Sequence, residues 1–184
     1  SSFYFDIRKD VLYCDDLSSK KRKDCIIVLN VILECLLKWL APIFVFTTEE
    51  IFNLINKNEK SIHETEFPKI PKSWGDEELV KKWKDLYQVK QDVNIAIEEK
   101  RTNKEIGSSL EADISIYVNE KKFHLLKDLN LEEYFITSKA KKIKDTKNEF
   151  KIVVKKASGA KCPRCWKILE SRCLRCEEAT NKKN

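Results

Sequence analysis

Glycine and histidine are scarce in this sequence, and their scarcity excludes several kinds of catalytic site. The only glycines are Gly75, Gly107 and Gly159, which stand too far apart to form a glycine-rich phosphate-binding loop. The only histidines are His63 and His124. We predict a surface or packing role for each of them, not a catalytic or metal-binding one. The residue inventory is therefore typical of a binding protein rather than an enzyme.

An uninterrupted hydrophobic segment is also missing. The longest apolar-rich stretch, residues 25–46, is broken by Asn30, Glu34, Lys38 and Pro42, so no span of about 20 apolar residues is available for a membrane helix. The first ten residues do not have the basic-then-apolar pattern of a secretion signal. Three of the seven cysteines are scattered through apolar sequence, which indicates reduced thiols rather than a disulfide framework. We therefore expect a cytoplasmic protein without a membrane partner.

Positive charge is concentrated at one end of the chain. The formal net charge is +6, yet residues 139–184 contain 15 Lys/Arg against 5 Asp/Glu. Such a local excess would attract a polyanion through phosphate neutralisation and counterion release. The alternative is a lysine-rich segment that is merely solvated.

Helical periodicity dominates the first half. Apolar residues recur at intervals of three and four over residues 17–40, which predicts a helix capped by Ser18 or Ser19. A second helix is predicted from Thr47, which would form a capping box with Glu50. Residues 57–75 read as a polar connection that contains proline.

A third, longer helix is predicted over residues 77–101, with Asp76 as its N-cap. After it the pattern changes: residues 113–118 and 150–156 have the character of strands, and residues 123–129 that of a helix. The sequence thus predicts a mainly α fold, in which a helical bundle is followed by a small α+β module and a C-terminal cysteine knuckle.

The strongest chemical signal is a pair of Cys-x-x-Cys motifs separated by seven residues. Two such motifs can bring four thiolates onto one tetrahedral Zn²⁺, closing its coordination shell, so the site is predicted to be structural. A thioredoxin-like redox pair and four unliganded thiols are the alternatives, and a redox pair would need only one of the motifs. The predicted zinc ligands are Cys162, Cys165, Cys173 and Cys176.

Basic and aromatic residues surround these cysteines. Arg164, Arg172 and Arg175 have guanidinium groups that pair with phosphates, and the Trp166 indole offers a face on which a base can stack. Alternatively, Trp166 covers the metal site as its small core.

Four phrases of the sequence are distinctive in their order: FYFDIRKDVLYCD (3–15), LLKWLAPIFVFTTEEIF (36–52), HETEFP (63–68) and KRTNKEIGSSLEADI (100–114). Together they resemble the C-terminal part of bacterial-type isoleucyl-tRNA synthetases. The ending CPRCW…CLRC is similar to the C-terminal zinc module of that family, although the family's two cysteine pairs are usually separated by a longer loop.

This resemblance implies a tRNA-recognition segment of a longer, ATP-dependent ligase chain. The catalytic motifs of the family, HIGH and KMSKS, do not occur, and a sequence without methionine cannot contain KMSKS in its usual form. The chain itself is therefore predicted to be inactive, with isoleucine tRNA and the rest of the synthetase as its partners.

The resemblance also implies three parts and a set of contact residues. These parts are a helical anticodon-binding domain (1–106), an α+β junction module (107–156) and a zinc-binding knuckle (157–184). The alternative function is a structural or protein-interaction module with little RNA affinity of its own. The residues expected to contact tRNA are Arg101, Lys104, Lys155, Lys156, Arg164, Trp166, Arg172 and Arg175.

Overall fold

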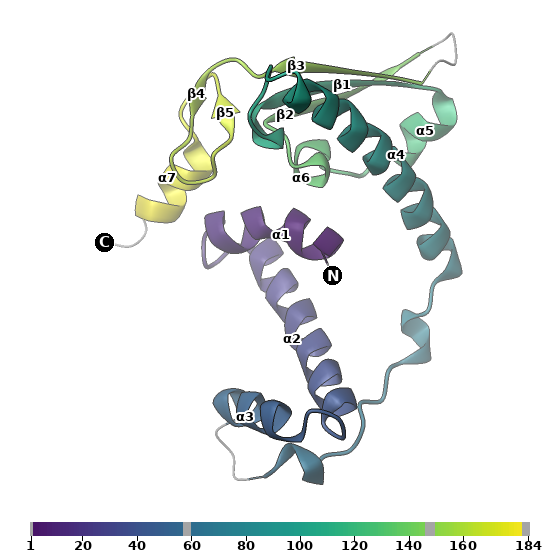
Figure 1. Ribbon diagram of the computed structural model, residues 1–184, viewed down its shortest axis with the longest axis vertical. Coiled ribbons are helices and arrows are strands. Elements are labelled where there is room, and N and C mark those ends of the chain that lie inside the picture. Colours follow the sequence, from purple (N-terminus) through teal and green to yellow (C-terminus); the bar gives the residue numbers. More distant parts are fainter. Residues whose placement is uncertain (1, 57–59, 146–149, 182–184) are drawn as a thin grey trace. The chain divides into compact units, whose positions relative to one another are not determined.

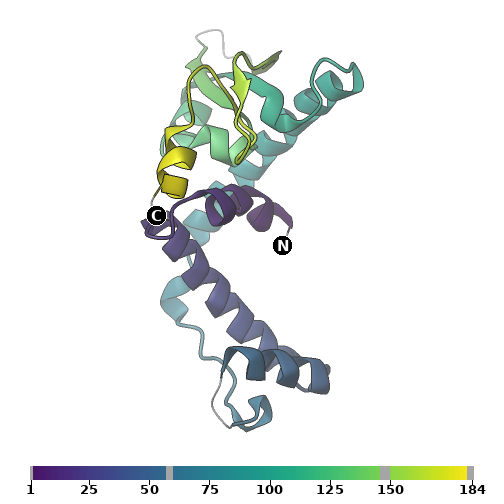
Figure 2. The same cartoon turned by 90° about the vertical axis from the view of Figure 1, so that its left-hand side faces the viewer.

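The computed structural model describes residues 2–56, 60–145 and 150–181. The chain forms two compact units, one made of Ser1–Asp16 with Asp76–Asn184 and the other of Leu17–Gly75. Figures 1 and 2 show the elements of both units from two directions.

The unit of Leu17–Gly75 contains helices α2 (Lys20–Leu40) and α3 (Val45–Ile55) and the short 3₁₀ helices η1 (Ile62–Glu64) and η2 (Lys72–Trp74). Its small core is formed by residues of α2, α3 and η1. The buried members are Leu37, Ala41 and Ile62, with Leu33, Ile51 and Phe52 packed against them.

The helix predicted over residues 17–40 is confirmed as α2, and Ser19 is its N-cap, because the Ser19 side chain accepts a hydrogen bond from the backbone of Arg22. The predicted capping box at Thr47 is wrong. Helix α3 starts two residues earlier, after Phe44, and has no side-chain cap. The turn after α2 is the reason: the backbone N–H of Phe44 donates to Leu40, and that of Thr48 to Phe44, so the helix already continues through Thr47. Residues 57–59 of the predicted connection lie outside the described residues.

The larger unit is built around a three-stranded sheet. Its strand order is β2-β1-β3; β1 pairs with β2 in parallel and with β3 in antiparallel fashion. The predicted helix at 77–101 is confirmed as α4, and Asp76 caps it through a 2.8 Å hydrogen bond from the Leu79 N–H. The elements are α1 (Ser2–Cys14), α4 (Glu77–Thr102), η3 (Ser109–Glu111), β1 (Ala112–Val118), α5 (Glu120–Leu125), α6 (Leu131–Phe135), β2 (Lys139–Lys144) and β3 (Lys151–Lys156).

Burial alternates strictly along β1, so one face of the sheet carries the core. Helix α4 presents a stripe of apolar residues to that core, and α6 adds Tyr134 and Phe135. In Figure 1, α5 and α6 both lie on the same side of the sheet. The residues that meet at this face include Ala112, Ile114, Ile116 and Val118 from β1 and Leu86, Val89, Val93 and Ile97 from α4.

The predicted strands at 113–118 and 150–156 are confirmed as β1 and β3, whereas β2 was not predicted. Four of the six residues in the segment 139–144 are lysines, so it lacks the apolar alternation that predicts a strand. Residues 146–149 of the basic segment 139–184 lie outside the described residues. The sheet tolerates Lys142 next to the core because its amine donates to the Leu126 carbonyl at 2.8 Å. The helix predicted at 123–129 is confirmed only in part, since α5 begins earlier and ends at Leu125.

The remaining elements form the C-terminal part of the same unit: β4 (Ala160–Lys161), β5 (Ile168–Leu169) and α7 (Leu174–Asn181). Strands β4 and β5 pair as a short antiparallel hairpin. The mainly α class with a small sheet and a clustered cysteine segment is thus confirmed. In the described part of the chain, no helix has both the length and the apolar character needed to cross a bilayer.

Candidate metal centre and its surroundings

The four cysteines of the paired motifs meet at one point. Cys162 and Cys165 lie between β4 and β5, Cys173 immediately precedes α7, and Cys176 lies in its first turn. All four sulfur atoms are within 4.8 Å of one another, and those of Cys165 and Cys173 are 3.8 Å apart. A tetrahedral ion with bonds of about 2.3 Å to sulfur requires sulfurs about 3.8 Å apart. These residues are therefore positioned to hold a metal ion.

Local backbone geometry produces this convergence. The Cys162 N–H donates to Lys167, and the Trp166 N–H donates back to Cys162, which folds the first motif into a tight turn. Trp166 adopts a left-handed conformation, with φ of 64°, a strained state for a bulky side chain. At the second motif the N–H groups of Cys176 and Glu177 both donate to the Cys173 carbonyl, which starts α7.

Gly159 allows the chain before β4 to lie in close contact with the backbone of β5. Its φ is +123°, and a Cβ atom at this position would lie 2.1 Å from the Leu169 carbonyl oxygen. Only glycine combines that backbone angle with so close a contact. At Gly159 the chain therefore passes directly over the backbone of β5.

The surroundings of the thiols differ from one to another. Burial opposes ionisation of Cys162, but N–H donors from Cys165 and Arg164 outweigh it and lower the pKa of this thiol to about 7. Burial raises the pKa of Cys165 and of Cys176, and the neighbouring Cys173 thiol raises that of Cys176 further. Two buried thiols thus resist ionisation in the protein alone, and a bound cation would favour their thiolate form.

Arg164 does not extend into solvent but caps the C-terminus of α1. Its guanidinium donates to the backbone carbonyl of Cys14 and, at 3.0 Å, to that of Tyr13. In return, the Cys14 thiol donates to the Arg164 carbonyl at 3.7 Å. Carbonyls in the last turn of a helix lack partners within the helix, so Arg164 satisfies two of them.

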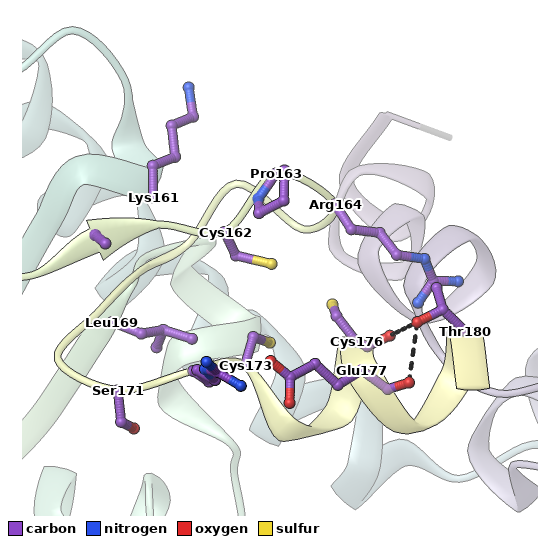
Figure 3. Close-up of a pocket in the computed structure, with 12 residues that line it drawn as sticks. Lys161, Cys162, Pro163, Arg164, Leu169, Ser171, Cys173, Cys176, Glu177 and Thr180 are labelled. Carbon is purple, nitrogen blue, oxygen red and sulfur yellow. Dashed lines mark hydrogen bonds between the residues drawn. The ribbon is translucent and has the colours of Figure 1, made fainter.

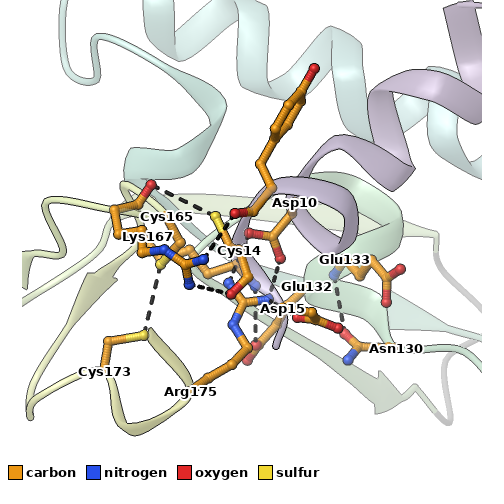
Figure 4. Close-up of polar contacts among 12 residues, drawn as sticks. Asp10, Cys14, Asp15, Asn130, Glu132, Glu133, Cys165, Lys167, Cys173 and Arg175 are labelled. Carbon is orange, nitrogen blue, oxygen red and sulfur yellow. Dashed lines mark hydrogen bonds and ion pairs between the residues drawn. The ribbon is translucent and has the colours of Figure 1, made fainter. Parts of the chain in front are cut away.

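Arg175 makes the second connection to α1 (Figure 4). Its guanidinium binds both oxygens of Asp10, at 2.6 and 2.8 Å, and Asp15 at 3.1 Å. Burial alone would raise the pKa of Asp10, but the hydrogen bonds and charge of Arg175 lower it. Bidentate pairs of this kind are among the stronger polar contacts.

Arg172 and Trp166, by contrast, are exposed. Arg172 lines a groove of about 300 Å³ beside the cysteine cluster, together with Lys161, Ser171 and Glu177 (Figure 3). The Trp166 ring is 59% exposed, and the Lys161 amine lies 5.6 Å from its centre. The indole is thus mostly open to solvent rather than buried over the cysteines.

The other residues expected to contact tRNA fall into two places. Arg101, Lys104 and Lys156 line an open depression of about 460 Å³ at the C-terminal end of α4. Arg101 pairs there with Glu98 at 2.5 Å, while Lys104 has a left-handed backbone with φ of 58°. Lys155 lies elsewhere, exposed on β3. The structure therefore brings three of the eight predicted residues together at α4 and four around the cysteines.

Sequence reasoning missed the part that α1 plays at this site. Asp10 and Cys14 are one helical turn apart, and both face the cysteine segment. The i, i+4 spacing of these two residues within the phrase FDIRKDVLYCD indicates that they share one face of a helix. It does not indicate what packs against that face, because the contacting residue Arg164 lies 150 positions later in the sequence.

The chain resembles known proteins over nearly its whole length. Residues 1–116 match the family model described as the anticodon-binding domain of tRNA ligase. The isoleucine–tRNA ligase of Pelagibacter ubique is 54% identical over 95% of this chain, and that of Bradyrhizobium diazoefficiens is 40% identical over 93%. The chain spans 19% and 18% of the length of these two relatives. By sequence and by domain, the chain belongs to the isoleucine–tRNA ligase family and corresponds to the region that carries the anticodon-binding domain.

Proposed function

We propose that this chain recognises the anticodon arm of isoleucine tRNA as part of a cytoplasmic isoleucine–tRNA ligase. The observation that carries the proposal is the match of residues 1–116 to an anticodon-binding domain. The basic excess after residue 139 would position the tRNA backbone, and unpaired anticodon bases would be read by stacking and by contacts to their edges. Trp166 and Arg172, both exposed, are the knuckle residues best placed for such contacts.

We further propose that the metal at the cysteine cluster is Zn²⁺ and that its role is structural. Four thiolates suit zinc, and they leave no position for water or substrate. The segment that they close has few apolar residues, so metal binding would supply much of its folding free energy. The bound ion would hold Arg164 and Arg175 in place against α1. We also propose that the chain has three functional parts: a tRNA-recognition domain (1–106), a junction (107–156) and a metal-binding module (157–184).

We infer that the ligation reaction belongs to other parts of the parent enzyme, because the HIGH and KMSKS motifs do not occur in this sequence. We therefore expect no isoleucine-dependent pyrophosphate exchange from the purified chain. Its contribution to the parent enzyme would be the selection and orientation of tRNA.

A titration of the chain with isoleucine tRNA and with a non-cognate tRNA, each at two salt concentrations, tests the tRNA proposal. Preference for the isoleucine tRNA and a steep loss of affinity with salt are expected. Absence of binding at low salt would contradict the proposal.

That negative result would leave the alternative of a structural or protein-interaction module. One observation favours this alternative: Arg164 and Arg175, which the sequence marks as RNA contacts, are engaged with α1. Their contact with RNA stays a prediction, and the titration decides between the two functions.

A further inference from the structure

The described helices of the larger unit cover one face of the sheet β2-β1-β3 and leave the other face open. The buried residues of β1 point toward α4 and α6, and the alternating residues Asp113, Ser115 and Tyr117 point to the opposite face and are only half-buried. No helix is seen above that face of the sheet in Figure 1 among the described elements of this unit.

Strand register sets which side chains share this open face. Tyr117 lies between Ile143 of β2 and Lys151 of β3, and Ser115 lies between Lys141 and Val153. In the third row, Asp113 lies between Lys139 and Lys155. The open face thus holds four lysines against a single carboxylate.

Three of these lysines are available to a ligand. Lys139 is paired with Glu170, whereas Lys141, Lys151 and Lys155 are exposed and have no ion pair with any described residue. Neighbouring strands are about 4.8 Å apart, so lysines on the two outer strands stand on the order of 10 Å apart across β1. Tyr117 and Ser115 occupy the strip between them.

We propose that this open face binds single-stranded RNA, with phosphates on Lys141, Lys151 and Lys155 and an unpaired base stacked on Tyr117. The inference rests on the proposed tRNA function and adds to it a second surface, separate from the cysteine knuckle. Lysines that flank an aromatic ring on an open sheet are suited to RNA, because the backbone pairs with the charges and every base offers a face for stacking. A duplex would use the lysines but not the ring.

The test replaces Lys141, Lys151 and Lys155 together by glutamine and measures affinity for an RNA hairpin with an unpaired loop. The matched control replaces Lys84, Lys121 and Lys127, exposed lysines away from the open face, so both triple variants lose the same charge. We expect the open-face variant to bind at least tenfold more weakly than the control variant. The plot of log affinity against log salt concentration should also be less steep for the open-face variant than for the unaltered chain, by about two in the magnitude of its slope. Unchanged far-ultraviolet circular dichroism shows that each variant is folded.

Tyr117 separates stacking from simple charge attraction. Tyr117→Leu should weaken binding to the hairpin about tenfold, the effect of losing one stacked base, and leave binding to a fully paired RNA of equal length unchanged. Tyr117→Phe keeps the ring and should bind both RNAs as the unaltered chain does. Equal loss with both RNAs, or no loss with either, would overturn the stacking role.

Failure of this inference differs from failure of the tRNA function itself. If the unaltered chain binds the hairpin but the open-face and control variants lose affinity equally, the open face is not the RNA site, and the proposed function stands. If the unaltered chain binds no RNA at low salt, both proposals fall.

Discussion

Arg175 and Asp10 form a bidentate ion pair, with nitrogen–oxygen distances of 2.6 and 2.8 Å, that joins α7 to α1 across 165 positions of the sequence. Because Arg175 directly precedes Cys176, its position depends on the cysteine cluster. The metal site and the first helix are thus coupled through one guanidinium.

Replacing Arg175 by alanine should lower the free energy of unfolding of the larger unit by about 1–2 kcal/mol, a value that allows for partial exposure of the pair. Arg172→Ala is the matched control. Arg172 is exposed, so its loss should change stability by less than about 0.5 kcal/mol. Denaturant unfolding monitors both variants, and equal effects from the two would contradict the role given to Arg175.

Removing the metal should release the end of α1. We expect the purified chain to contain one zinc ion, and a chelator to remove it. Backbone amides near Cys14 should then exchange hydrogen faster, because Arg164 and Arg175 lose their fixed positions. Cys176→Ser should have the same effect without chelator. Cys35→Ser, a buried cysteine in the smaller unit, should keep the full zinc content; loss of zinc from this variant would argue against the assignment of the ligands.

Gly159→Ala should disrupt the hairpin. The added methyl group would lie 2.1 Å from the Leu169 carbonyl oxygen at a φ of +123°, so the expected loss of stability is on the order of 2–4 kcal/mol. Gly75→Ala is the control, since its nearest contact, the Lys72 carbonyl, is 3.3 Å away. Zinc retention against a chelator and thermal unfolding measure the outcome. A Gly159 variant that keeps zinc as firmly as the Gly75 variant would show that the hairpin adapts.

The pH dependence of the smaller unit should reflect Glu49. Its carboxylate accepts hydrogen bonds from the Ile62 N–H and the Ser61 hydroxyl, each at 2.9 Å, and these bonds lower its pKa below the ordinary value of 4.5. A carboxylate whose pKa is lowered by folding stabilises the folded state at pH values above its ordinary pKa. This stabilisation is lost as the pH falls through the lowered pKa of the folded state.

The Ile62 amide resonance reports this titration directly. We expect its chemical shift to change with a midpoint below pH 4.5, and the change to vanish in Glu49→Gln. A midpoint at or above the ordinary value would show that the two hydrogen bonds do not persist in solution.

The parts of the fold that local sequence determines were predictable. Helix α4 has a clear apolar period and an aspartate cap, and β1 alternates along its length. Strand β2 could not be predicted because its lysines interrupt the alternation of apolar and polar residues that indicates a strand. Lys142 is accommodated next to the core by a hydrogen bond to the Leu126 carbonyl. The start of α3 was wrong because the turn after α2 outweighs the local capping signal.

At the candidate site, the spacing of the cysteines was enough to predict that they converge. The roles of the neighbouring arginines could not be predicted from their spacing. Arg164 and Arg172 look alike in the sequence, since each stands beside a cysteine, yet the first caps α1 and the second faces solvent. Only the position of α1, which comes from distant sequence, distinguishes them.

The place of α1 also bears on how the protein is made. Its partner side chains follow it by 150 to 165 positions, so a ribosome adding about 5–20 residues per second needs on the order of 10–30 s to supply them. During that interval the Asp10 face of α1 has no native counterpart. Formation of the larger unit therefore waits until residues 164–175 have been translated, and a chaperone would have an opportunity to bind α1 during this interval.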